Sequence, residues 1–147
     1  MKFKIENLSP KHIEQVVAIE KECFSDPWTR GMFENELNNG RAHYTVLLDG
    51  EAVIGYTGFW KIEDEAHIMN IAVDTQYRRK HLADSLMEDM IMRAKALSIK
   101  HMTLEVRSSN SGAISLYKKY GFKETGIRKN YYEKGNEDAV IMWKECE

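Results

Sequence analysis

The stretch that decides the fold is Ile68–Leu97, which opens with Ile68-Met69-Asn70-Ile71-Ala72-Val73 and continues, after Asp74-Thr75-Gln76-Tyr77, with Arg78-Arg79-Lys80-His81-Leu82-Ala83. The first run is apolar and contains β-branched residues, which predicts a buried strand. After the basic residues, an apolar stripe at helical spacing predicts an amphipathic helix; its members are Leu82, Leu86, Met90, Ala94 and Leu97. The predicted order is therefore strand, basic turn and helix.

The junction between this strand and this helix suits an anion. The first turn of a helix leaves backbone N–H groups unpaired, and the helix dipole favours negative charge there. The cationic side chains of Arg78, Arg79 and Lys80 stand beside those groups and would suit a pyrophosphate. On the residues alone, a solvated basic surface turn explains the same charge run equally well.

Length and composition restrict the class of protein. The chain has 147 residues, of which 43% are hydrophobic and 30% charged, and we expect one soluble globular domain over residues 1–147. The net charge of -2 argues against nucleic-acid binding as the main role. The N-terminus lacks the apolar core of a signal peptide, and no stretch approaches the length of a membrane span. We therefore expect a cytoplasmic protein with neither a membrane nor a nucleic acid as its partner.

Cysteine and histidine usage indicates neither a disulfide framework nor a metal. The two cysteines, Cys23 and Cys146, fit a reducing compartment. Cys23 lies on the apolar face of a predicted helix, which favours a core cysteine over a nucleophile. The five histidines show no metal-ligand spacing, and we expect no metal.

The segments before the deciding stretch alternate between strands and helices. They are the strand Phe3–Asn7, a helix that begins after Ser9-Pro10, a short helix capped by Thr29, and the strands Ala42–Leu48 and Ala52–Ile62. The apolar stripe of the first helix also takes in a glutamate, Glu20. Asp49-Gly50 predicts a type I′ hairpin between the two strands.

The segments after it complete a sheet. They are the strand His101–Arg107, a helix capped by Ser108-Ser109-Asn110 and ended by Gly121, and the strands Phe122–Arg128 and Ala139–Lys144, with Asn130-Tyr131-Tyr132 and Gly135-Asn136-Glu137-Asp138 between these two. The order β-α-α-β-β-β-α-β-α-β-β predicts a single α/β (mixed α+β) domain. Its central sheet should be mixed, mostly antiparallel, and covered by helices on both faces.

Four side chains are candidates for chemistry, and each has a simpler explanation. Glu105 is a lone carboxylate in an apolar strand; a buried carboxylate can serve as a base, but strand alternation favours a side chain that faces solvent. Tyr117 lies on the apolar stripe of its helix, where a core tyrosine is the commoner finding. Asn110 fits an N-cap, and Trp28 fits a core plug between two helices, although it could also wall a groove.

The basic turn resembles the acyl-CoA-binding motif of the GCN5-related N-acetyltransferases (GNAT), in which a strand precedes Arg/Gln-x-x-Gly-x-Gly/Ala at the start of a helix. The matching residues are Arg78-x-x-His81-x-Ala83. His81 replaces the first glycine. This departure costs strain if φ is positive there, although histidine tolerates the left-handed conformation better than β-branched residues do.

The whole chain resembles one branch of that family, the RimI-type ribosomal-protein alanine N-acetyltransferases. The resemblance is carried by Pro27-Trp28, Leu104-Glu105-Val106-Arg107-Ser108-Ser109-Asn110, Ala113-Ile114-Ser115-Leu116-Tyr117, Tyr120-Gly121-Phe122, Arg128-Lys129-Asn130-Tyr131-Tyr132 and Glu137-Asp138-Ala139-Val140-Ile141-Met142. The Glu-Val-Arg-x-Ser-Asn and Asn-Tyr-Tyr segments are specific to this branch, whereas the Ala-x-x-Leu-Tyr-x-x-x-Gly-Phe run is shared by many N-acetyltransferases.

The resemblance implies transfer of an acetyl group from acetyl-CoA to the N-terminal α-amine of a protein, by family the alanine of bacterial ribosomal protein S18. It implies that Glu105 is the general base and that Tyr117 is the general acid that protonates the CoA thiolate. The residues it implies for the cofactor are Ile71, Ala72, Val73, Arg78, Arg79, Lys80, His81, Leu82, Ala83, Asp84, Asn110 and Tyr117. Those it implies for the acceptor groove are Trp28, Tyr131 and Tyr132.

Two other functions stay open on the sequence. One keeps the acetyl transfer but changes the acceptor to a lysine side chain, a small amine or other protein N-termini. The other is a non-catalytic acyl-CoA-binding module, which the His81 departure allows. Retention of Glu105 and Tyr117 together favours an enzyme over such a module.

Overall fold

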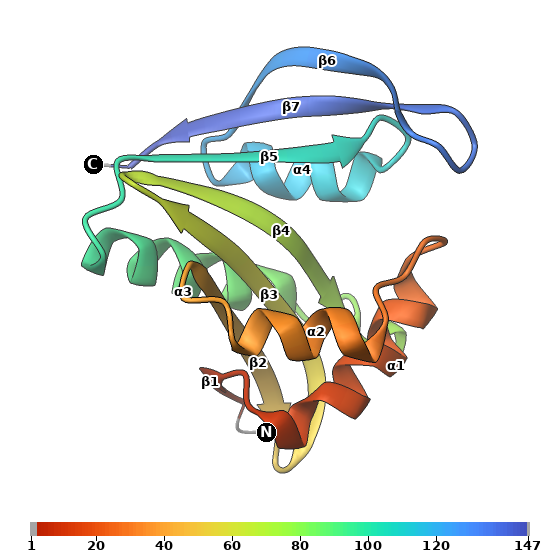
Figure 1. Ribbon diagram of the computed structural model, residues 1–147, viewed down its shortest axis with the longest axis vertical. Coiled ribbons are helices and arrows are strands. Elements are labelled where there is room, and N and C mark those ends of the chain that lie inside the picture. The colour runs from red at the N-terminus through yellow and green to blue at the C-terminus, as the bar shows by residue number, and fades with distance from the viewer. Residues whose placement is uncertain (1–2, 147) are drawn as a thin grey trace.

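A seven-stranded sheet forms the centre of the computed structural model, which describes residues 3–146 (Figure 1). The strands are β1 (Phe3–Asn7), β2 (Ala42–Asp49), β3 (Ala52–Ile62), β4 (Glu65–Val73), β5 (His101–Arg107), β6 (Lys123–Tyr132) and β7 (Glu137–Glu145). Their order in the sheet is β1-β2-β3-β4-β5-β7-β6, and every neighbouring pair is antiparallel except β4 and β5. The predicted mixed, mostly antiparallel sheet is confirmed.

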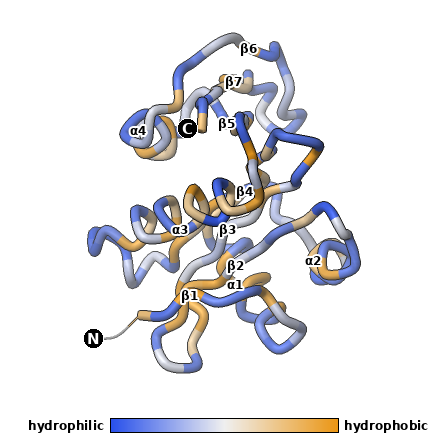
Figure 2. Tube along the Cα trace, turned by 90° about the vertical axis from the view of Figure 1, so that its left-hand side faces the viewer, coloured by the Kyte–Doolittle hydropathy of each residue, from blue (hydrophilic) through white to orange (hydrophobic). Residues whose placement is uncertain are grey.

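Four helices cover the two faces of this sheet. They are α1 (Ile13–Cys23), α2 (Arg30–Leu37), α3 (Leu82–Ala96) and α4 (Ser111–Lys119), and two short 3₁₀ turns, Pro10–His12 and Thr75–Tyr77, precede α1 and α3. In Figure 2, α3 and α4 lie on one side of the strands and α2 lies on the other. The predicted order of elements and the helices on both faces are confirmed.

Separate apolar clusters hold the helices on each face. On one face Ile13 and Val16 of α1 and Phe33 of α2 pack against β2 and β3. On the other face Met87 and Met90 of α3 share a cluster with residues of α4 and β5. Because both faces are buried, β3 carries a run of buried side chains rather than a strict alternation.

The sheet divides between β4 and β5. These two parallel strands pair only over Glu65–His67 and His101–Thr103. Beyond that point they separate, as Figure 1 shows. The remaining lengths of β4 and β5 are therefore free to line a cleft from opposite sides.

Two details of the connections differ from the prediction. Asp49 still pairs with Ala52, so the turn residues are Gly50 and Glu51, and of these only Gly50 has a positive φ, of 63°. A type I′ turn needs a positive φ at both central residues, so that prediction was wrong.

The segments predicted to connect the last two strands also differ, because Asn130-Tyr131-Tyr132 belongs to β6 and Glu137-Asp138 belongs to β7. The register shift between Arg128 and Tyr132 interrupts the pairing there without ending the strand.

Within residues 3–146, every helix is too short or too polar to cross a membrane.

Candidate active site

Two adjoining cavities lie where β4 and β5 separate. The first, here the β5 cavity, measures about 380 Å³ and is lined by residues of β4 and β5, of the loop after α1, of α4 and of β6. The second, here the α3 cavity, measures about 740 Å³ and extends from the end of β4 to the start of α3. Ile71, Arg107 and Asn110 line both cavities, so the two form one continuous site.

Glu105 lies on the wall of the β5 cavity. Its neighbours Leu104 and Val106 are buried in the core, so alternation along β5 turns the carboxylate to the opposite face. The Arg128 Nε lies 3.4 Å from the carboxylate, and the Tyr131 hydroxyl donates a hydrogen bond to it at 3.4 Å. The side chain is 34% exposed, as alternation along the strand favoured, so Glu105 is not a buried carboxylate.

Tyr117 is both a core residue and a cavity residue. It is only 5% exposed, and its ring packs edge-on against Phe122 with 5.6 Å between the centroids. It nevertheless lines the β5 cavity, and its hydroxyl makes no hydrogen bond to any residue between 3 and 146. Burial raises the pKa of Tyr117, so the hydroxyl stays protonated and is free to donate into the cavity.

The residue at the first glycine position of the motif has a left-handed backbone conformation. His81 is the N-cap residue in the left-handed region, with φ 58° and ψ 29°, and its side chain makes no capping hydrogen bond. Arg79 also has a positive φ, of 66°. Because no side chain caps the helix, its first N–H groups remain available to a ligand in the α3 cavity.

Most of the predicted cofactor residues line the α3 cavity; these are Ile71, Ala72, Val73, Arg78, Arg79, His81, Leu82, Ala83, Asp84 and Asn110. Tyr117 lines the β5 cavity instead. Lys80 stands outside both sets of lining residues, with its Nζ 5.4 Å from the centre of the Tyr77 ring. The structure therefore brings together the predicted residues except Lys80.

The carboxylate of Asp84 is directed toward α4. Its Oδ1 accepts hydrogen bonds from the Lys119 Nζ and from the Tyr120 hydroxyl, each at 2.7 Å. The hydrogen bond from Lys119, followed by that from Tyr120, lowers the pKa of Asp84 and keeps it negative. A carboxylate would repel a pyrophosphate, so only the backbone of Asp84 suits an anion, and its side chain joins α3 to α4.

Arg78 and Cys23 hold the end of β4 against α1. The Arg78 Nε donates to the Val73 carbonyl oxygen at 3.4 Å, and Nη2 lies 3.3 Å from the Cys23 sulfur. Cys23 is half-buried and lines the α3 cavity rather than lying wholly within the core. Burial raises the pKa of its thiol, which agrees with the predicted packing role and not with a nucleophile.

Asn110 acts as the predicted N-cap of α4, because its side-chain oxygen accepts from the Ala113 N–H at 3.2 Å. The same residue lines both cavities. Its capping role and a place in the site are therefore compatible.

Three aromatic residues predicted for the acceptor line the β5 cavity: Trp28, Tyr131 and Tyr132. Trp28 also packs against Phe33, with ring centroids 5.3 Å apart. It therefore packs in the core between α1 and α2 and also lines the cavity. Tyr131 and Tyr132 meet edge-to-face at 5.1 Å, and the Arg107 guanidinium lies 4.2 Å from the Tyr132 ring. Burial raises the pKa of Tyr132 to about 12.

Glu20 is a cavity residue that the sequence argument did not assign. It lines the β5 cavity from α1, yet it is only 1% exposed. The signal was present in the sequence, because a glutamate on an otherwise apolar helical stripe has to be buried with partners or break the stripe.

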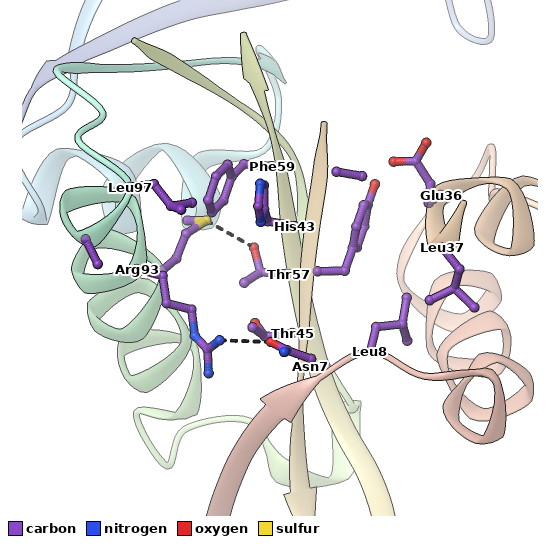
Figure 3. Close-up of a pocket in the computed structure, with 14 residues that line it drawn as sticks. Asn7, Leu8, Glu36, Leu37, His43, Thr45, Thr57, Phe59, Arg93 and Leu97 are labelled. Atoms are coloured by element: carbon purple, nitrogen blue, oxygen red, sulfur yellow. Dashed lines mark hydrogen bonds between the residues drawn. The ribbon is translucent and has the colours of Figure 1, made fainter. Parts of the chain in front are cut away.

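A third cavity, of about 440 Å³, lies at the outer edge of β2 between α2 and α3. In Figure 3, Arg93 of α3 donates a hydrogen bond to the Asn7 side chain at the end of β1. The Thr57 hydroxyl donates one to the sulfur of Met90. This cavity shares no lining residue with the other two and contains none of the predicted site residues. Among residues 3–146 there is also no group of three or more His, Cys, Asp or Glu side chains that could hold a metal ion.

We expect His81→Gly to raise the stability of the protein slightly. A left-handed conformation costs a non-glycine residue roughly 1 kcal/mol, and part of that gain is offset by the greater freedom of glycine in the unfolded chain, which leaves about 0.5 kcal/mol. His81→Ala is the matched control, because it also removes the exposed imidazole but keeps the Cβ that causes the strain. Thermal unfolding of both variants would show a higher Tm for glycine than for alanine; the reverse order would mean that the φ of this residue is not strained.

The chain is similar to known proteins over almost its whole length. The model of the acetyltransferase (GNAT) family matches residues 13–122. A Bacillus subtilis (strain 168) protein, provisionally named [ribosomal protein bS18]-alanine N-acetyltransferase, is 41% identical over 143 residues, which cover 97% of this chain and 95% of that protein.

Two solved structures are similar over almost the whole chain. The crystal structure of the ribosomal-protein-S18-alanine N-acetyltransferase from Escherichia coli is 32% identical with a TM-score of 0.91, covering 99% of this chain and 94% of the other. Ard1 from Thermoplasma volcanium is 29% identical with a TM-score of 0.93, covering 100% and 99%.

Proposed function

This chain belongs to the acetyltransferase (GNAT) family, and from that premise we propose that it transfers the acetyl group of acetyl-CoA to the N-terminal α-amine of a protein. The protein acceptor is ribosomal protein bS18, acetylated on its N-terminal alanine. The similarity to relatives named for that reaction supports the acceptor. The observation that carries the chemistry is that Glu105 and Tyr117 line one cavity, which is continuous with the cavity at the start of α3.

Acetyl-CoA enters through the α3 cavity. The uncapped first turn of α3 receives the pyrophosphate, and the guanidinium groups of Arg78 and Arg79 add positive charge beside it. The pantetheine arm follows the free edge of β4 at Ile71–Val73, where backbone groups can bind its amides. About 740 Å³ is within the range of cavities that hold ligands of this kind.

The amine is activated by Glu105. An α-amine has a pKa near 8, so most of it is protonated at neutral pH and cannot attack. Glu105 removes that proton, and the amine nitrogen forms its bond to the thioester carbon directly, with no covalent enzyme intermediate. The guanidinium already beside this carboxylate, that of Arg128 at 3.4 Å, supports its ability to bind a cationic group.

The leaving sulfur is stabilised by Tyr117. When the carbon–sulfur bond breaks, the electron pair goes to sulfur, and the Tyr117 hydroxyl donates its proton there. The second proton, which the nitrogen loses as the amide forms, restores the neutral tyrosine. A free thiol has a pKa of about 8.5, so the developing thiolate accepts a proton at neutral pH. The thioester oxygen can be polarised by backbone N–H groups of β4, whose pairing with β3 is interrupted by a register shift between Gly58 and Phe59.

The acceptor chain enters the β5 cavity end-first. Trp28, Tyr131 and Tyr132 are large and rigid, and they can form the walls that receive the terminal residue and limit its size. A lysine acceptor would need a passage for a long aliphatic arm with peptide on both sides.

Since ribosomal proteins are made and assembled in the cytoplasm, this proposal also places the enzyme there.

The proposal is tested by the rate at which CoA thiol is released from acetyl-CoA. A peptide with the bS18 N-terminal sequence and a free alanine α-amine should release thiol at a rate that increases with peptide concentration to saturation. The same peptide with a blocked N-terminus and an internal lysine should give only the rate measured without peptide. Equal rates for the free and blocked peptides would exclude the α-amine as the acceptor.

A further inference from the structure

Glu20 is a buried carboxylate to which the reaction above gives no role. It lies one turn before the end of α1, is 1% exposed, and lines the β5 cavity. Carboxylates are almost never buried without partners, because removing the charge from water is costly. The partners of Glu20 therefore indicate what its burial achieves.

The two oxygens of Glu20 join three separate segments. Oε2 accepts a hydrogen bond from the Trp28 backbone N–H at 3.0 Å. Oε1 accepts one from the buried Tyr56 hydroxyl on β3 and a longer one, at 3.5 Å, from the Asn70 side-chain amide on β4. Burial raises the pKa of Glu20, while the hydrogen bonds from Tyr56 and Trp28 act in the opposite direction and favour the charged form.

Two of these partners belong to the wall of the β5 cavity. Trp28 and Asn70 both line it, and Asn70 lies on the stretch of β4 that faces the gap toward β5. The loop that carries Trp28 makes few other hydrogen bonds to the rest of the described chain. Within residues 3–146, the hydrogen bonds that connect residues 25–28 to the rest of the chain are that of Trp28 to Glu20 and that of the Lys134 Nζ to the Ser25 carbonyl oxygen.

We propose that Glu20 is a positioning residue for the acceptor: its carboxylate fixes two parts of the wall of the β5 cavity, Trp28 and Asn70, so that the entering α-amine is held in line with Glu105 and the thioester. This inference rests on the proposed function. Glu20 acts through the wall of the cavity and not on the reacting atoms. Because Glu20 does not line the α3 cavity, acetyl-CoA binding is independent of it.

The test compares Glu20→Gln with Glu14→Gln, a change on the exposed face of the same helix. Glutamine is nearly isosteric, but it has one acceptor oxygen instead of two. It therefore cannot accept from Trp28 on one side and from Tyr56 and Asn70 on the other at the same time. Misplacing a bound group by about 1 Å can cost roughly 100-fold in rate, and we expect kcat/KM for the peptide to fall by about 10- to 100-fold in Glu20→Gln. The affinity for acetyl-CoA in titration calorimetry should stay at the wild-type value, and Glu14→Gln should match the wild type in both measurements.

A second variant removes one hydrogen-bond partner of Glu20 and keeps the carboxylate itself. Tyr56→Phe removes one partner of Glu20 and leaves the hydrogen bond to Trp28, so kcat/KM should fall less than in Glu20→Gln. If Glu20→Gln leaves kcat/KM unchanged, or weakens acetyl-CoA as much as it weakens the peptide reaction, the positioning role is overturned. A wild-type protein that does not acetylate the peptide at all would instead overturn the proposed function.

Discussion

Glu105→Gln is expected to lower kcat by about 10²- to 10⁴-fold, which is the usual contribution of a general base. The amide has the shape of the carboxylate but cannot take a proton from the α-ammonium group. The residual rate of the variant should rise toward pH 8 and above, because free amine accumulates as the pH passes its pKa of about 8. Steady-state kinetics of thiol release across this pH range would measure both effects.

The fold and the acetyl-CoA site should survive this change. The Glu105 side chain is partly exposed, and its contacts with Arg128 and Tyr131 are both 3.4 Å long, so little stability depends on them. Acetyl-CoA affinity should be unchanged in titration calorimetry. Glu145→Gln, at the far end of the same sheet, is the control and should have wild-type kinetics. Near-native turnover in Glu105→Gln would leave Glu105 as a surface carboxylate and remove it from the mechanism.

Tyr117→Phe should lower kcat by a similar factor, about 10²- to 10⁴-fold, with little change in Tm. The substitution removes one hydroxyl and keeps the ring that packs against Phe122. Because this hydroxyl has no hydrogen-bond partner within residues 3–146, removing it leaves no buried group unpaired. Thiol release at saturating acetyl-CoA and thermal unfolding would measure the two quantities.

Tyr120→Phe, at the residue that directly follows α4, should show the opposite pattern. The Tyr120 hydroxyl donates to Asp84 at 2.7 Å, and a hydrogen bond to a charged group contributes about 1.5–3 kcal/mol to stability. We therefore expect a lower Tm with kcat retained at saturating acetyl-CoA. If Tyr117→Phe instead loses stability and keeps its turnover, Tyr117 is a core residue only.

The order of the elements could be predicted because it depends on local patterns. Apolar runs, helical stripes and N-caps can be recognised within short stretches of sequence. The predicted N-caps Thr29 and Asn110 both accept the expected backbone hydrogen bonds. The prediction that β6 ends at Arg128 was wrong for a non-local reason. Asn130 has a positive φ of 51°, which resembles a turn, but pairing of Tyr132 with Glu137 continues the strand.

The site was less predictable, because its character depends on which segments meet. Alternation alone turned Glu105 away from the core, but only the separation of β4 from β5 makes that face a cavity. The orientation of Asp84 depends on Lys119, which is 35 residues away in the sequence. Glu20 was visible as a glutamate on an apolar stripe, yet its partners on β3 and β4 lie 36 and 50 residues from it.

The most direct test of the central claim is to locate the acetyl group on the product. The purified protein would be incubated with acetyl-CoA and a peptide that begins with a free alanine and contains an internal lysine, and the product would be sequenced by fragment-ion mass spectrometry. We predict that every fragment containing the N-terminal residue carries the acetyl group, and that fragments containing only the lysine do not. Acetylation confined to the lysine would contradict the N-terminal assignment.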